Sequence, residues 1–376
     1  MIFYMNKAIL LILSLGFLNL AQADISISGY QEYFAGSADQ SIASGTTNHG
    51  IDMAGLSNGT YTRLTANYTS TLDSGIELNG IYTMAARDCM GNLGTANCGV
   101  TNFNSVTFSG SFGSIGVGEM FDVGASMFSR LTAGVPTAEP DGANIGHFYT
   151  GGSADTYNFG SANETNYAAN NMKAVYNSNI YNGFSFAVGF TPNNAEGGAA
   201  DDAQATTIQN SKYTTFSDII TTIAKYSMEM DGISMNAAYG MISGNAGQVA
   251  GTDYNDLEET VYSIELGYAG FTADYRKNEA DNSGQVKNNQ AGNDEGTSIC
   301  AMYSFANIGL GACQVDTNFT DISNFDNNSK TRTYSADYNL GGGVKIGAVY
   351  FDVEQTANNV TITDAEGVMT MLAVGF

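Results

Sequence analysis

The chain has 376 residues, with 13 Lys and Arg against 37 Asp and Glu, a formal net charge of −24. This balance argues against nucleic acid as a partner, because phosphate contacts need clustered cations, and it favours cations at a surface or in a lumen. With only three prolines and no composition break typical of a linker, the chain is expected to form one domain.

The first 23 residues are typical of a secretory signal. Lys7 precedes an apolar run from Ala8 to Leu20, and Ala21-Gln22-Ala23 supplies small residues at the positions a signal peptidase reads. The alternative, a membrane anchor, is disfavoured because a spanning helix needs about 20 apolar residues. We therefore expect a cleaved signal over 1–23 and one mature domain over 24–376.

The mature chain alternates apolar and polar residues in segments typical of β-strands. Sixteen such segments begin near Ile25, Tyr61, Ile76, Phe103, Ser114, Asn171, Gly183, Thr221, Gly232, Glu259, Gly270, Thr297, Asn307, Thr331, Val344 and Glu366. This count predicts an all-β fold.

The links between these segments alternate between short and long. Short links lie at 72–75, 112–114, 178–183, 230–232, 306–307 and 340–343. Long polar links cover about 36–59, 88–102, 122–170, 191–220, 242–258, 278–296, 316–330 and 354–365. Short turns at one end and long loops at the other are the topology of a bacterial transmembrane barrel, with the turns on the periplasmic side.

The two faces of the segments support this prediction. Ile264 and Leu266 alternate with Ser263 and Glu265, and the final segment sets Val368, Leu372 and Phe376 against the smaller face of Met369, Met371 and Ala373. Charges thus avoid the large apolar face, as expected where Arg or Lys at the bilayer midplane costs about 2–4 kcal/mol. The other parity should line water, and sixteen strands leave an aqueous channel.

Charges of both signs fall on this lumen parity, where they are expected to form wall pairs. They are Glu77, Arg87, Lys173, Lys225, Glu229, Glu265, Asp274, Arg276, Asp337 and Lys345. The segment 122–170, the longest link, is the candidate for partial plugging of the pore.

Three stretches resemble Gram-negative general porins, and the likeness extends over the mature chain. VTFSGSFGSIGVGEM (106–120) resembles the fourth and fifth porin strands, KAVYNSNIYNGFSFAVGF (173–190) resembles the sixth and seventh, and LAVGF (372–376) resembles the signal by which the outer-membrane assembly machinery recognises the last strand. By this resemblance, Phe376 is expected to face lipid and to close the barrel against the strand at Ile25.

The resemblance also implies a homotrimer whose third long loop folds into each pore and opposes carboxylates to basic wall residues. Arg63 lies where porins often keep a wall arginine, but Glu119 lies where many relatives carry Arg, and it points inward only if a bulge re-aims it. The expected constriction comprises the wall residues Arg63, Glu77, Arg87 and Glu119 and the loop residues Asp122, Glu139 and Asp141.

Four cysteines in an oxidising compartment suggest pairs. Cys89 and Cys98 share one expected external loop, and Cys300 and Cys313 would face each other across a hairpin if 306–307 is a two-residue turn. Free thiols are the alternative for either pair.

Enzymatic motifs are weak. GLSNG at 55–59 matches a Gly-x-Ser-x-Gly pattern, but it lies in a long loop and not at a strand-to-helix turn. His49 and His147, the only histidines, have no neighbouring ligands at metal spacing. We expect no catalytic residue, no metal site and no cofactor.

The resulting hypothesis is a general diffusion channel for small hydrophilic solutes and cations, weakly cation-selective and in contact with outer-membrane lipid and lipopolysaccharide. Two alternatives stay open. A substrate-specific channel would carry an aromatic track, whereas the lumen parity here is mainly Ser, Thr, Asn and Gly. A barrel acting as adhesin or receptor would use its external loops.

Overall fold

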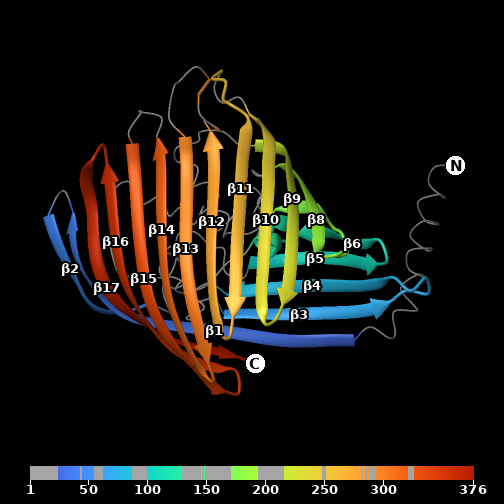
Figure 1. Ribbon diagram of the computed structural model, residues 1–376, viewed down its shortest axis with the longest axis horizontal. Coiled ribbons are helices and arrows are strands. Elements are labelled where there is room, and N and C mark those ends of the chain that lie inside the picture. Colours follow the sequence, from blue (N-terminus) through green and yellow to red (C-terminus); the bar gives the residue numbers. More distant parts are fainter. Residues whose placement is uncertain are drawn as a thin grey trace.

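The computed structural model describes residues 24–42, 45–54, 62–86, 100–128, 145, 148, 171–193, 216–247, 251–281, 283, 286–287, 293–320 and 326–376. These residues form seventeen strands and one short helix, which Figure 1 shows. They are β1 (Asp24–Ile42), β2 (Gly45–Ala54), β3 (Thr62–Thr71), β4 (Glu77–Ala86), β5 (Val100–Gly110), β6 (Gly113–Glu119), α2 (Val123–Met127), β7 (Met172–Asn177), β8 (Phe184–Asn193), β9 (Phe216–Met230), β10 (Ile233–Ala246), β11 (Leu257–Tyr268), β12 (Phe271–Asp281), β13 (Asn293–Phe305), β14 (Ile308–Thr320), β15 (Asp326–Gly341), β16 (Val344–Ala357) and β17 (Val360–Gly375).

The strands form one closed antiparallel sheet. Each pairs with the next in the chain from β3 to β17, and β17 pairs with β1. The first half of β1 pairs with β3 and its second half with β2, so β2 and β3 share one position in the wall. The seventeen strands therefore occupy sixteen positions, which confirms the predicted sixteen-stranded barrel.

The closing seam lies between the two ends of the described chain. Gly29 donates to the carbonyl of Phe376 at 2.7 Å, and Phe376 donates back to Gly29 at 2.9 Å. The Phe376 ring lies over Gly29, where an added Cβ would come within 2.1 Å of Phe376 Cζ. The expected pairing of the last strand with the first is therefore confirmed, and glycine leaves room for the terminal ring.

Two expected long loops are largely strand. The loop expected over 36–59 contains the end of β1 and all of β2. The loop expected over 354–365 is a tight hairpin, in which β16 ends at Ala357 and β17 starts at Val360. Asn358 and Asn359 both have positive φ, 51° and 61°, as a type I′ turn requires. These predictions were wrong because polar residues occupy both faces of a sheet that extends beyond its apolar band.

We call the end of the barrel with the links 72–76, 231–232, 269–270 and 306–307 the short-turn end and the opposite one the long-loop end. In Figure 1, β10–β17 form the front wall with the short-turn end below, and β3–β6 cross behind them. Several strands continue further toward the long-loop end than expected, β12 to Asp281 and β14 to Thr320.

The alternating faces of the wall agree with the sequence pattern. Ile264 and Leu266 are 40% and 46% exposed on the outward face, whereas the inward-facing Ser263 is 5% exposed. On β17, Val368 and Leu372 are exposed, whereas Met369 and Met371 are buried inside. The outward face is therefore an apolar surface suited to lipid, as predicted.

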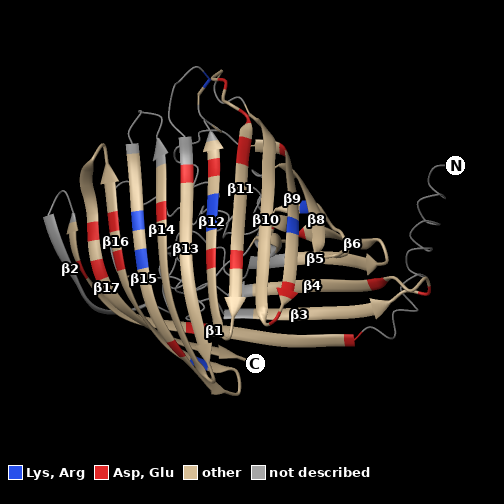
Figure 2. Cartoon of the chain, in the orientation of Figure 1, with Lys and Arg blue, Asp and Glu red and all other residues tan. Residues whose placement is uncertain are grey.

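Charges lie mainly toward the long-loop ends of the front strands, as Figure 2 shows on β12 and β14–β17. On the outward face there, Arg332 Nη1 lies 2.6 Å from Asp352, and Lys330 lies 3.3 Å from Asp316. Tyr334 and Tyr350 lie next to these pairs toward the short-turn end, with ring centroids 6.2 Å apart. Tyrosines between apolar and charged residues are typical of a membrane interface.

The seam gives a first test. Gly29→Ala should lower the free energy of unfolding by about 1–3 kcal/mol, because the new methyl group displaces the Phe376 ring. The matched control is Gly375→Ala, where the nearest atoms to an added Cβ are 3.8 and 3.9 Å away. Urea unfolding of both variants in detergent measures the difference, and equal stabilities would contradict this account of the seam.

Candidate functional site

The chain after β6 turns into the barrel and forms α2 against the inner wall. Asp122 caps this helix, its side chain accepting a hydrogen bond from the Val123 amide at 2.7 Å. Capping satisfies a backbone donor that the first helical turn would otherwise leave without a partner. A short helix thus starts where the wall strand stops.

The apolar side of this segment covers one sector of the inner wall. Val123, Met127 and Phe128 pack against inward side chains of β7–β11 near the long-loop end. Those side chains are Val175, Ala187, Phe216, Ile219, Ile223, Ala238, Ile242, Leu257 and Val261. Burial of these side chains holds the start of the 122–170 segment on the wall.

A second apolar sector lies on β16, β17 and β1. Ile145 and Phe148, from the same segment, are buried there at 0% and 1% exposure. Their wall partners are Phe34, Ala38, Val349, Phe351, Val353, Ala365, Met369, Met371 and Ala373. Both ends of the described part of this loop are therefore attached inside the barrel, through different wall sectors.

The prediction that the inward parity is polar throughout is thus wrong for these two sectors. Inward apolar side chains would be unfavourable against water, but here they face loop side chains. The sequence held one signal of this, the apolar inner face of the last strand, Met369, Met371 and Ala373. Phe128 and Thr221, which the sequence reasoning missed, have no local motif that marks them as contacts between the loop and the wall.

Polar contacts fix the same loop at its start. Thr221 of β9 donates to Asp122 Oδ2 at 2.6 Å, and Lys173 of β7 donates to the carbonyl of Met120 at 2.6 Å. Burial raises the pKa of the Asp122 carboxyl, while the nearby Lys173 ammonium and the hydrogen bonds from Thr221 and Val123 oppose that rise. Asp122 is therefore a buried anchor of the loop.

Phe128 forms the other anchor. Its ring lies over Gly240 of β10, where an added Cβ would be 2.7 Å from Phe128 Cζ. The guanidinium of Arg276, on β12, lies 5.0 Å from the ring centroid on the inner side of the wall, within the range of a cation–π interaction. Arg276 itself is 1% exposed.

Toward the short-turn end the inner wall becomes accessible and polar. Ser227 of β9 donates to Asn236 of β10 at 2.7 Å, and Asn236 donates to Glu265 of β11 at 2.9 Å. Further around the wall, Lys345 lies 2.5 Å from Asp337, one of the wall pairs expected from mixed signs. We call this polar part of the inner wall, with Ser227, Asn236, Glu265, Asp337 and Lys345, the polar vestibule.

The expected constriction residues are spread along the barrel. Glu77 starts β4 beside the turn 72–76, at the short-turn end. Glu119 ends β6 in register with Asn104 and Met172, and neither pairing shifts there, so it stays on the outward parity of Ile115 and Val117.

The remaining constriction residues are less completely placed. The backbone of Arg63 lies opposite Tyr30 on β1. Arg87, Glu139 and Asp141 lie outside the described residues, as do the signal segment 1–23 and GLSNG at 55–59. Among those described, Asp122 alone is seated on the inner wall with a basic partner nearby, Lys173.

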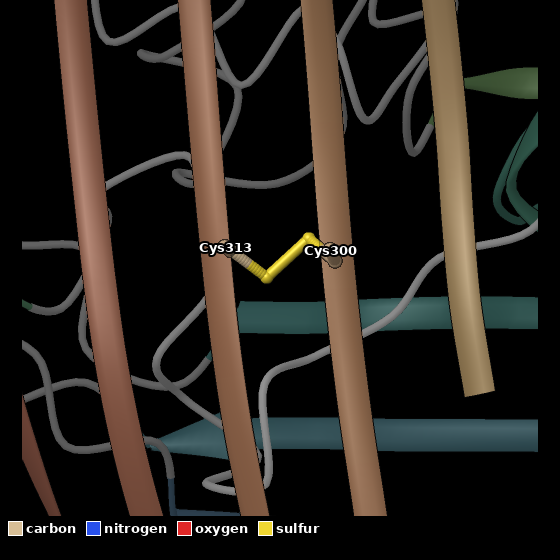
Figure 3. Close-up of a disulfide and its surroundings, with 2 residues drawn as sticks. All are labelled: Cys300 and Cys313. Atoms are coloured by element: carbon tan, nitrogen blue, oxygen red, sulfur yellow. A yellow bond between two sulfur atoms is a disulfide. The ribbon is translucent and has the colours of Figure 1, made fainter. Parts of the chain in front are cut away.

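Cys300 and Cys313 are directly opposed across β13 and β14 and joined by a disulfide, drawn in Figure 3. Their Cα atoms are 4.1 Å apart, and both side chains face the lumen side, at 2% and 5% exposure. The turn at 306–307 sets this register, as the sequence indicated. Cys89 and Cys98 lie outside the described residues.

Other site types find no support in the described part of the chain. It contains no helix with the length and apolar character needed to cross a membrane. Within the same residues, no three His, Cys, Asp or Glu side chains gather where a metal ion could be held.

Comparison with known proteins decides the family. The model of the Gram-negative porin family matches residues 14–359. The chain belongs to this family. The porin resemblance seen in the sequence is thereby confirmed, although no curated protein sequence matches the chain.

Solved structures share the fold of this porin. An anion-selective porin from Comamonas acidovorans is 12% identical, with a TM-score of 0.63 over 94% of this chain and 100% of that one. OmpF of Salmonella typhi in complex with daunomycin is 13% identical, with a TM-score of 0.61 over 94% and 97%. The outer membrane channel DcaP of Acinetobacter baumannii is 9% identical, with a TM-score of 0.60 over 95% and 98%. At these identities the likeness is one of fold.

The role of Phe128 as a loop anchor can be tested by mutation. Phe128→Ala removes a buried ring, a change that costs about 3–5 kcal/mol in a packed core, and should detach the start of the loop from the wall of the porin. Single-channel recording should then show larger and noisier current than wild type. Phe121→Ala, at a side chain that is 43% exposed, is the control and should leave the current unchanged; equal currents in all three proteins would refute the anchor.

The disulfide allows a second test. Replacing Cys300 and Cys313 by Ser together should leave the barrel intact but lower the free energy of unfolding by up to about 3 kcal/mol, since the bond closes a short loop of the unfolded chain. Unfolding of wild type in dithiothreitol should show the same loss. Should the reductant destabilise the Ser variant equally, the effect does not arise from this bond.

Proposed function

We propose that this porin forms a water-filled channel through the outer membrane, by which small hydrophilic solutes and ions diffuse passively. The observation that carries the proposal is the closed sixteen-position barrel with an accessible polar inner wall below the attached loop. Eight-stranded barrels fill with side chains, whereas barrels of about sixteen strands leave an aqueous interior.

We infer weak cation selectivity from the charge balance. The net charge of −24 should raise the local concentration of cations at the mouths of the channel. The fold does not fix the sign, because the Comamonas acidovorans porin of similar fold is anion-selective. Selectivity therefore depends on the side chains of this chain's own lumen.

The constriction is proposed where the loop meets the wall. Asp122, with Lys173 beside it, is its described part, and Glu139 and Asp141 are proposed to add carboxylates from the loop. Arg63 and Arg87 are proposed for the opposite wall, as the porin resemblance implies. Glu77 and Glu119 are weaker candidates, because one lies beside a turn and the other on the outward parity.

The cellular setting is proposed from the same family. A signal peptide over 1–23 would be cleaved on export, and Phe376 would be read by the outer-membrane assembly machinery. A homotrimer in contact with lipopolysaccharide is proposed, supported by the trimer form of Vibrio cholerae OmpT, which is 11% identical with a TM-score of 0.56.

Recording in a planar bilayer under a potassium chloride gradient tests these proposals together. Stepwise openings in groups of three, with a reversal potential of the cation sign, are expected. A reversal potential of the anion sign would refute the selectivity. Block by one solute at low concentration would indicate a substrate-specific channel, and silence of a folded barrel would indicate a receptor or adhesin.

A further inference from the structure

The charged side chains of the described inner wall differ in how far ions can reach them. Lys173 and Arg276 are 2% and 1% exposed, the first donating to Met120 and the second stacked on Phe128. Lys345 is held by Asp337 at 2.5 Å. These cations are engaged by protein groups and do not stand free in the polar vestibule.

Glu265 differs from them in position and access. It is half-buried on the inward face of β11, on the short-turn side of the apolar sector that Leu257 and Val261 form with α2. Its carboxylate therefore lies on the inner wall between the loop attachments and the short-turn end.

The carboxylate of Glu265 is also fixed in place. The chain Ser227–Asn236–Glu265 runs across three neighbouring strands in direct register, with hydrogen bonds of 2.7 and 2.9 Å. An oriented carboxylate keeps its charge at one point of the wall, whereas the charge of an exposed carboxylate near a turn, such as that of Glu229, is screened by salt.

A second acidic residue lies beside Glu265. Asp274 lies directly opposite Glu265 on β12 and is 5% exposed. Side chains directly opposed in an antiparallel pair have Cβ atoms about 4.5–5.5 Å apart. Lys225 is the inward-facing residue next to Ser227 on β9, and it is two strands away from Glu265.

We propose that Glu265, held by Asn236, is a specificity-determining residue that gives the channel its preference for cations over anions. This rests on the proposed channel function. By this proposal, the residue of the described wall that determines selectivity lies on β11, in the polar vestibule. The loop carboxylates can add to its effect.

Glu265→Gln keeps the hydrogen bond from Asn236 and removes the charge. The ratio of potassium to chloride permeability, from reversal potentials in a potassium chloride gradient, should fall roughly two- to threefold. This is the change for a unit charge about 7 Å from the ion path in water, acting with opposite sign on the two ions and reduced to about half by salt screening. Glu265→Asp should retain most of the wild-type ratio. Glu366→Gln removes a carboxylate from the outward face, where it accepts from Tyr350 at 3.0 Å, and should leave the ratio unchanged.

Asn236→Ala provides an independent measurement, because it removes the hydrogen bond that orients the Glu265 carboxylate and should lower the ratio. A Glu265→Gln channel with the wild-type ratio, or an Asn236→Ala channel whose ratio does not fall, overturns the proposal while leaving the channel function intact. A wild-type barrel that conducts nothing overturns both. Conductance that falls in Glu265→Gln with the ratio unchanged would show a steric effect and also overturns the proposal.

Discussion

Every backbone donor and acceptor of a membrane-spanning strand must be satisfied within the protein, and closure of the sheet is what achieves this. In this chain closure depends on β1, whose first half pairs with β3 while its second half lies between β2 and β17. The hydrogen bonds between Gly29 and Phe376 complete the closure of the barrel at the short-turn end. This one ring of strand pairings determines the shape of the lumen and the depth of the apolar band. It also determines which residues lie side by side on the inner wall.

A closed barrel of sixteen strand positions also needs a structure that narrows its wide interior. In this chain, apolar residues face inward on two sectors of the wall, and one loop packs against both. Phe128 and Met127 pack on β7–β11, and Phe148 packs on β16, β17 and β1. Hydrophobic burial is non-directional, so Asp122 and Arg276 supply the directional contacts that fix where the loop starts.

The periodicity of the sequence was sufficient for the strands, since one face meets lipid and alternation follows from that. It also placed Cys300 opposite Cys313, because a two-residue turn determines the register of a hairpin. The periodicity failed where the sheet extends beyond the membrane, because neither face of a strand needs to be apolar there. For this reason the sequence of β2 and of the hairpin at Asn358 predicted polar loops. Contacts between the loop and the inner wall, such as that of Thr221 with Asp122, join residues about a hundred positions apart and leave no periodic pattern in the sequence.

The charges on the outside of the barrel must be distinguished from those that face its lumen. Several acidic residues of the described strands lie on the outward face near the long-loop end, where Asp352 and Glu366 are directly opposed and Asp39 follows on β1. Those groups face away from the lumen and are screened beyond about 8–10 Å at physiological salt. The net charge of −24 therefore acts at the mouths of the channel and does not by itself give the sign of the charge inside the pore. The sign that an ion meets inside depends on which few inner charges remain accessible once the loop and the wall pairs have engaged the rest.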